Sequence, residues 1–417
     1  MGRTKDLEIV NLNNVFVLTG FPEYTYVIRN NIDHNVKSCI GDRGTHIFLF
    51  GSSKNGKTSL WKKYINSEEN IEIKITKDTT LDSFINIIVD KLQVYTLVEK
   101  MEKKVTSEEI KGSIEGNAII IKSNVDGTMG SENETSNIYQ KMGKQEIDVN
   151  KLIECLKPAN KIIIIEDFHI ASDNFIKSFS HILKALADEK LQMVIVGIDN
   201  KVPLVINERE DIKARIKVFN ISNFEDENIR DIIELGCNKL NISFSDKMIN
   251  MIVKESEHKA YIAQAICKNI CIIKNIERTL AIKQFFDELN TVEKACKLLA
   301  HSEDEVYKNV IHSIASNGTA SNKNDTYIWT LKVLEKYKIS DRGITNREFY
   351  AHIRNLGNSV MKQGSINACI PKLPSILNKA DTNIQVFSYR DKRLFITDDF
   401  FQFYLRWSDE MKNYCDF

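Results

Sequence analysis

The stretch Gly51-Ser52-Ser53-Lys54-Asn55-Gly56-Lys57-Thr58 decides the fold of this chain. It fits the pattern G-x-x-x-x-G-K-[ST], in which a glycine-rich loop holds phosphate groups. The apolar run at residues 46–50 predicts a short buried strand before the loop, and residues 59–65 predict the start of a helix after it. Strand, glycine loop and helix are the context that this motif requires, so we interpret it as a phosphate-binding loop.

The spacing within the loop has a physical reason. Gly51 and Gly56 let the backbone curl so that successive N–H groups point at a phosphate, and the following helix adds its partial positive charge. Lys57 is expected to reach the β- and γ-phosphates, and the Thr58 hydroxyl to coordinate Mg²⁺. The predicted ligands are therefore ATP and Mg²⁺. The predicted phosphate-binding residues are Gly51, Ser52, Ser53, Lys54, Asn55, Gly56, Lys57, Thr58 and Ser59.

Length and composition set the class of protein. A chain of 417 residues can form two or three domains, and 42% hydrophobic with 27% charged residues is typical of a globular protein. Lys+Arg and Asp+Glu are both 57, so no net charge draws the chain to nucleic acid or to an anionic membrane, although a local basic face is still allowed.

Hydrophobic runs and cysteines set the expected compartment. No run approaches the roughly 18 apolar residues of a membrane span, and the N-terminus lacks the apolar core of a signal peptide. The eight cysteines are scattered, and Cys267 and Cys271 are predicted to be buried reduced thiols rather than metal ligands. We therefore expect a cytoplasmic protein with no membrane contact.

A second motif follows about a hundred residues later. Four isoleucines, Ile162 to Ile165, predict a buried strand that ends in Glu166 and Asp167. This resembles a Walker B segment, in which one acid supports the Mg²⁺ shell and the other polarises the attacking water. By position Glu166 takes the metal role and Asp167 the catalytic role. The usual order is Asp then Glu, and the shorter second acid favours slow hydrolysis. The alternative is a strand whose acids cap a helix.

Four further polar residues come after the next predicted strand, which spans residues 192–198. Asp199 and Asn200 close it, and a polar residue there could sense the γ-phosphate or belong to a plain turn. Arg209 and Arg215 precede the helical region. An arginine there often reaches the nucleotide of a neighbouring subunit, and we favour Arg215 for this finger over Arg209. A surface ion pair is the alternative for Arg215.

Apolar periodicity predicts three domains, 1–218, 219–301 and 302–417. The first is an α/β P-loop domain with a doubly wound parallel sheet, and it carries a β-rich insertion near 105–136 that includes a hairpin between 109 and 125. Its predicted helix at 80–103 precedes that insertion. After Val218 the pattern predicts helices alone, the last of them at 281–301. The third domain shows helices, including one at 344–354 with a capping box and one at 366–377, and then a hairpin at 384–397. This order is typical of a winged helix.

Together these features resemble the prokaryotic AAA+/STAND-type ATPases related to the archaeal origin-recognition proteins. Residues 21–29 resemble a box that lies beside the adenine in this group, so the resemblance implies that Tyr26 and Val27 contact adenine and that Arg29 supports them. The Phe168-His169 pair and residues 401–407 also look characteristic. One departure is the absence of a clear sensor 2 arginine at 255–264, where His258 or Lys259 is the substitute.

The resemblance implies an ATP-dependent switch that hydrolyses ATP slowly. ATP binding would close the lid and drive self-assembly into a homo-oligomer or engagement of an effector, in prokaryotic antiphage defence signalling. Because the sequence shows no effector domain or repeat sensor, we expect the effector to be a separate protein or the chain to act as a bare switch. An alternative is a winged-helix DNA-binding ATPase like an initiator or loader. A modest basic cluster supports it: Lys362, Lys372, Lys379, Arg390, Lys392 and Arg393. A small-molecule kinase is a third reading, which the lid and winged helix disfavour.

Overall fold

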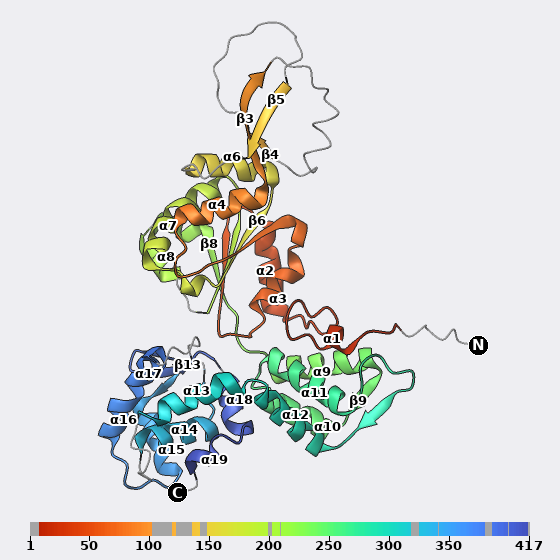
Figure 1. Ribbon diagram of the computed structural model, residues 1–417, viewed down its shortest axis with the longest axis vertical. Coiled ribbons are helices and arrows are strands. Elements are labelled where there is room, and N and C mark those ends of the chain that lie inside the picture. The colour runs from red at the N-terminus through yellow and green to blue at the C-terminus, as the bar shows by residue number, and fades with distance from the viewer. Residues whose placement is uncertain are drawn as a thin grey trace, which may run out of the picture. The chain divides into compact units, whose positions relative to one another are not determined.

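The computed structural model of the chain is shown in Figure 1. It divides into two compact units, and each is described by itself. The sheet unit comprises residues 30–51 and 60–221, and the lid unit comprises residues 1–29, 52–59 and 222–417. The structure describes residues 8–101, 119–121, 136–141, 148–198, 202–208, 210–317, 325–340, 342–379, 386–398 and 400–415.

The sheet unit is built on five parallel strands in the order β2-β6-β7-β1-β8. All four neighbouring pairs are parallel, so the carboxyl ends of the strands share one edge, which is where α/β proteins bind ligands. Strand β7 lies between the strand that precedes the glycine loop and the strand that ends in the two acids. The strands are β1 (His46–Phe50), β2 (Asn70–Lys74), β6 (Ile162–Glu166), β7 (Met193–Gly197) and β8 (Ile216–Asn220).

Helices cover both faces of this sheet. Alternate residues of β6 and β7 belong to two different hydrophobic clusters: Ile163 and Ile165 pack with α4 (Leu81–Leu92), α6 (Val149–Ala159) and α7 (Asp173–Asp188), whereas Ile162 and Ile164 pack with α2 (Asn30–Gly41) and α3 (Lys57–Tyr64). Side chains alternate between the faces of a strand, so an apolar run without polar interruptions is what a doubly covered sheet needs. The predicted α/β class is confirmed.

The predicted helix at 80–103 is wrong beyond residue 92. Helix α4 ends at Leu92, Gln93 takes the left-handed conformation (φ 50°), and β3 (Val94–Met101) follows. Strand β3 pairs in parallel with β4 (Ile119–Ile121) and antiparallel with β5 (Ser136–Lys141). The β-rich insertion therefore begins earlier than predicted. Most of the predicted hairpin at 109–125 lies outside the described residues.

The lid unit contains helices α9 (Asp226–Leu240), α10 (Asp246–Glu255), α11 (Ala260–Ile273) and α12 (Leu289–His301). The N-terminal segment with α1 (Leu12–Val15) joins it, since Leu12 N donates to Glu277 O at 2.8 Å and Thr279 N to Val10 O at 3.0 Å. The prediction of helices alone after Val218 is wrong. Strand β8 continues to Asn220, and β9 (Ile242–Phe244) and β10 (Gln284–Phe286) form a small parallel pair. Because β10 occupies the start of the predicted helix 281–301, α12 begins only at Leu289.

The C-terminal part of the lid unit combines helices with a three-stranded sheet in the order β11-β13-β12. The predicted capping box is confirmed: Glu348 N donates to Thr345 Oγ1 at 3.2 Å, and Thr345 N to Glu348 Oε2 at 2.8 Å. Asp391 and Lys392 both have positive φ in the hairpin turn, as a tight two-residue hairpin requires. The elements are α13 (Asp304–Ala315), α14 (Thr326–Lys336), β11 (Ile344–Thr345), α15 (Asn346–Asn355), α16 (Gln363–Cys369), η4 (Ile370–Lys372), α17 (Leu373–Lys379), β12 (Phe387–Arg390), β13 (Arg393–Ile396), α18 (Phe400–Trp407) and α19 (Lys412–Cys415).

One helix of this part differs from its prediction. The expected continuous helix at 366–377 is divided into α16, η4 and α17. Pro371 is the reason, because it has no N–H to continue the hydrogen-bond ladder and stands at the start of the 3₁₀ turn. The lid helices and the C-terminal helices share one hydrophobic cluster, so the lid unit has a continuous core. Among the helices that the structure describes, none has the length and apolar character to cross a bilayer.

Candidate nucleotide-binding site

The glycine loop has the backbone that its sequence predicts. Gly51 has φ 144°, and a Cβ at this position would lie 2.3 Å from the carbonyl oxygen of Ile221, so only glycine fits. Gly56 has φ 77°, and α3 begins at the next residue, Lys57. Lys57 Nζ donates to the carbonyl oxygen of Ser52 at 2.8 Å. The loop therefore combines a helix N-terminus with a lysine that reaches back across it, the arrangement that suits a phosphate.

The buried side of the loop is held by two cations. Asn55 is 1% exposed, and its Oδ1 accepts a hydrogen bond from Lys259 Nζ at 2.7 Å. Its backbone oxygen accepts from Arg29 Nη1 at 3.3 Å, and the Arg29 guanidinium lies over the Phe224 ring at 4.3 Å. The resemblance predicted Arg29 as a support and Lys259 as a sensor 2 substitute. The structure places both against the loop itself.

Lys54, at the tip of the loop, contacts aromatic rings. Its Nζ lies 4.4 Å from the centroid of Tyr261 on α11 and 4.7 Å from that of Phe400 on α18. A cation over aromatic faces is attracted by about 0.5–1 kcal/mol per contact when exposed. Sequence reasoning assigned Lys54 to the phosphates but did not anticipate these rings, because Phe400 is far along the chain.

The other loop residues stand at the start of α3 or before it. Thr58 is exposed and Ser59 half-buried, both in the first turn of α3, while Ser52 and Ser53 are half-buried. A hydroxyl at the second position of α3 suits an Mg²⁺ ion shared with a phosphate. The glycine cradle, Lys57 and Thr58 thus fit a nucleotide with Mg²⁺.

The acidic strand end is buried in the sheet unit. Glu166 ends β6 and is 7% exposed, and its Oε1 accepts a hydrogen bond from Trp61 Nε1 at 2.7 Å. Asp167 follows in the left-handed conformation (φ 60°), half-buried, and precedes η2 (Phe168–Ile170). Sequence reasoning missed Trp61. The feature of the sequence that could have identified Trp61 is its position: its indole N–H lies one helical turn after Lys57, on the helix that follows the loop.

The predicted adenine segment packs in the lid unit. Tyr26 stacks on Phe21 with ring centroids 5.5 Å apart, and Val27 packs against the main hydrophobic cluster. Thr25, just before them, is buried and donates to Gln264 Oε1 on α11 at 2.9 Å. These contacts tie the segment to the lid helices.

The remaining candidates are placed as follows. Arg215 pairs with Asp188 in the sheet unit: its Nε lies 2.9 Å and its Nη2 2.5 Å from Asp188 Oδ1. Asp199, Asn200 and Arg209 lie outside the described residues.

Two predictions for the lid unit concern its histidine and its cysteines. His258 pairs with Asp226 at 3.1 Å, and burial lowers the pKa of its imidazole. Cys267 and Cys271 are buried free thiols, as predicted, and burial raises the pKa of both.

Comparison with solved structures places the fold. No protein-family model and no curated protein sequence matches the chain. A Walker-type ATPase of Pyrococcus abyssi is similar in structure, with a TM-score of 0.52 and 10% sequence identity over 94% of this chain and 99% of that one. The ORC1 protein of Aeropyrum pernix in complex with DNA gives a TM-score of 0.42 at 10% identity, over 97% of each chain. Cdc6p from Pyrobaculum aerophilum gives 0.40 at 12%, over 97% of this chain and 99% of that one.

The likeness to the Pyrococcus abyssi ATPase shows the fold alone. This chain shares the α/β fold of that Walker-type ATPase: a parallel five-stranded sheet with a glycine loop after strand β1.

Proposed function

We propose that the chain is an ATP-binding switch that holds Mg-ATP at the glycine loop and hydrolyses it slowly. The observation that carries this proposal is the loop itself: a glycine at 51 that no other residue can replace, followed by Lys57 at the start of α3. In this proposal Thr58 and Glu166 hold Mg²⁺, and Asp167 polarises the attacking water. Tyr26 and Val27 contact adenine, Asp199 senses the γ-phosphate, and Arg215 acts from a neighbouring subunit.

The lid and the C-terminal part complete the proposed switch. We propose the division into residues 1–218, 219–301 and 302–417, with a winged helix in the last part. The order α14, β11, α15, α16–α17, β12, β13 and the sheet order β11-β13-β12 support a winged helix. Self-assembly or capture of a separate effector, in prokaryotic antiphage signalling, rests on the resemblance to STAND-type ATPases. The buried free thiols support a reducing, cytoplasmic compartment.

The second candidate is a DNA-binding, initiator-like ATPase. It is favoured by two exposed lysines, Lys372 in η4 between α16 and α17 and Lys392 in the hairpin turn, since such a helix and wing approach DNA in winged-helix proteins. Against it, Arg393 is engaged by the carbonyl oxygens of Arg342 and Gly343 at 3.3 and 3.1 Å. A fall of DNA affinity with salt would favour this candidate over the switch.

The decisive experiment is equilibrium binding of fluorescent ATP, with molar mass measured by light scattering in the same samples. We expect the wild-type protein to bind Mg-ATP and to form a defined oligomer. Lys57→Ala removes a charged phosphate donor, and we expect affinity to fall by about 1.5–3 kcal/mol, which is roughly 10- to 150-fold in Kd. Unchanged binding in this variant would overturn the assignment of the site.

The acids separate binding from hydrolysis. Glu166→Ala and Asp167→Ala should bind ATP but fail to turn it over, which traps the ATP-bound oligomer. Single-turnover hydrolysis with radiolabelled ATP is the measurement. Either variant that hydrolyses ATP at the wild-type rate removes that acid from the proposed mechanism.

A further inference from the structure

The turn between α10 and α11, residues 255–259, has an unusual backbone. Glu257 and His258 are consecutive non-glycine residues with φ of 52° and 62°. Residues with a Cβ rarely adopt this backbone conformation. Two such residues in succession persist only where surrounding contacts hold them in place. The turn is also buried: Ser256 is fully buried, and Glu257 is 4% exposed. The contacts on its two sides therefore determine its shape.

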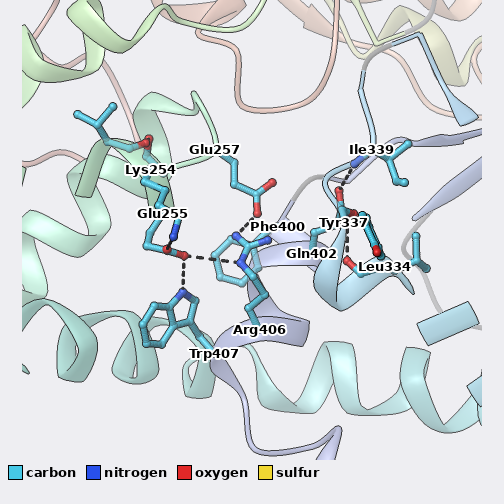
Figure 2. Close-up of polar contacts among 12 residues, drawn as sticks. Lys254, Glu255, Glu257, Leu334, Tyr337, Ile339, Phe400, Gln402, Arg406 and Trp407 are labelled. Carbon is cyan, nitrogen blue, oxygen red and sulfur yellow. Dashed lines mark hydrogen bonds and ion pairs between the residues drawn. The ribbon is translucent and has the colours of Figure 1, made fainter. Parts of the chain in front are cut away.

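On one side, the turn is held by the C-terminal helix α18, as Figure 2 shows. The Arg406 guanidinium binds the carboxylate of Glu257 and lies 3.6 Å from Glu255 Oε2 through its Nε. Trp407 Nε1 donates to the same Glu255 oxygen at 2.9 Å. Two neighbouring residues of α18 thus bind the acids of the turn: Arg406 contacts both Glu255 and Glu257, and Trp407 contacts Glu255.

Helix α18 is itself fixed to the rest of the C-terminal part. Gln402 is 1% exposed, and its Nε2 donates to the carbonyl oxygens of Leu334 and Tyr337 at 2.8 and 2.9 Å (Figure 2). Its Oε1 accepts from Ile339 N at 3.3 Å. Any rearrangement of the C-terminal part that moves α14 must therefore move Arg406 as well.

On its other side, the turn reaches the glycine loop. Lys259, the last residue of the turn, is 1% exposed. Its Nζ donates to Asn55 Oδ1 in the loop at 2.7 Å and to Asn223 Oδ1 at 2.5 Å. The carbonyl oxygen of His258 accepts from Phe224 N at 3.0 Å. The position of Asn55 therefore depends on where the turn places Lys259.

We propose that Lys259 is a positioning residue for the glycine loop, and that Arg406 on α18 controls it through the turn. The inference rests on the proposed nucleotide binding at that loop. Lys259 Nζ is bonded to amide oxygens of Asn55 and Asn223, so it acts on the nucleotide through the loop. The C-terminal part thereby sets nucleotide affinity without touching the nucleotide. The contact of Lys54 with Tyr261 and Phe400 forms a second link between the same loop and α18.

The test compares Arg406→Gln, Lys259→Met and the double variant by fluorescent ATP titration. Each single variant loosens the hold on Asn55, and we expect Kd to rise about fivefold or more, the usual scale of coupling between sites. Because both substitutions act through the contact between Lys259 and Asn55, the double variant should bind ATP no more weakly than Lys259→Met alone. The matched control is Lys308→Ala, which breaks the ion pairs of Lys308 with Asp304 and Glu410 in the C-terminal part but does not touch the turn. Its Kd should stay at the wild-type value.

A second readout does not need nucleotide. In the nucleotide-free protein, amide hydrogen exchange of residues 52–59 should be faster in Arg406→Gln than in wild type or Lys308→Ala. Additive effects in the double variant, or unchanged loop exchange in Arg406→Gln with an intact melting transition, would overturn the proposal. A wild-type protein that binds no ATP would instead overturn the proposed function, and the exchange result would still decide the role of Arg406.

Discussion

The sheet unit and the lid unit hold their buried ionisable groups in different ways. In the sheet unit His46 is completely buried, its Nε2 donates to Leu183 O at 2.7 Å, and its Nδ1 accepts from Met193 N at 3.2 Å. Burial lowers the pKa of this imidazole to about 4, so the ring is neutral at pH 7. The lid unit instead buries the carboxylate of Glu257 against the guanidinium of Arg406.

The difference follows from what surrounds each group. His46 lies on a central strand between two helical layers, where backbone groups are the partners within reach and a charge would be costly. Glu166, at the carboxyl end of strand β6 in the same sheet, accepts a hydrogen bond from the neutral indole of Trp61. In the lid unit, the buried carboxylates of Glu255 and Glu257 lie in the turn beside the glycine loop, where both meet the guanidinium of Arg406. The stability of the sheet unit should therefore respond more strongly to acid pH, and that of the lid unit more strongly to the loss of a charged partner.

The largest expected effect is on the sheet unit at acid pH. The folded-state pKa of His46 is about 4, against 6.5 for an unperturbed histidine, so below pH 6.5 the unfolded chain binds the proton more readily. Stability should fall as pH drops from 6.5 to 4, by about 3 kcal/mol from this group. Urea unfolding at pH 7.5, 5.5 and 4.5 measures it. In the lid unit, burial also lowers the pKa values of His258 and His352, so these two half-buried residues contribute to acid sensitivity in the same direction.

The control for this prediction is His46→Gln. It is less stable at pH 7 because it cannot reproduce both hydrogen bonds, but the part of the pH dependence that belongs to His46 should disappear. An identical loss between pH 7.5 and 4.5 in both proteins would show that the buried imidazole does not govern acid sensitivity.

The next largest effect is expected from a substitution that breaks a polar contact of the lid unit. Asn55→Leu keeps the size of the side chain but removes an acceptor from the buried Lys259. We expect a loss of about 2–3 kcal/mol in unfolding free energy, the scale for hydrogen bonds to charged groups. Asn250→Leu is the matched control, because Asn250 Oδ1 also accepts from a cation, Arg230, but on the surface. Equal losses in the two variants would mean that burial of Lys259 adds nothing.

The same kind of substitution in the sheet unit sharpens the contrast. Trp61→Phe retains most of the ring packing and removes one neutral donor from Glu166. The expected loss is smaller, about 1.5 kcal/mol, and should be accompanied by loss of any fluorescence change that Mg²⁺ with ATP causes at Trp61. Trp329→Phe on α14 serves as the control and should leave that signal in place. A fluorescence response that survives in Trp61→Phe would separate the indole from the acid site.

Local sequence patterns predicted the features that depend on residues close together in the chain. The glycine loop, the buried strands β6 and β7, and the capping box of Thr345 and Glu348 all follow from residues within a few positions of each other. The short strands β9 and β10 were missed because three residues carry little periodic signal, and apolar spacing continued across Leu92 into β3. The two contacts that shape the site were out of reach, since Lys259 lies 204 residues from Asn55 and Trp61 lies 105 from Glu166.

The smallest expected effect tests the arginine of the sheet unit. Arg215 and Asp188 form a partly exposed pair, with side chains 32% and 46% accessible, so breaking it should cost under about 1 kcal/mol in unfolding free energy. Arg215→Ala and Asp188→Ala should therefore show nearly equal, small losses in urea unfolding. Their ATPase rates separate the two readings of Arg215, because Asp188→Ala breaks the pair but keeps the arginine. As a finger, Arg215 is needed for hydrolysis in the oligomer, so only Arg215→Ala should be slow. Equal ATPase rates in both variants would mean that Arg215 contributes only the ion pair and does not act in hydrolysis.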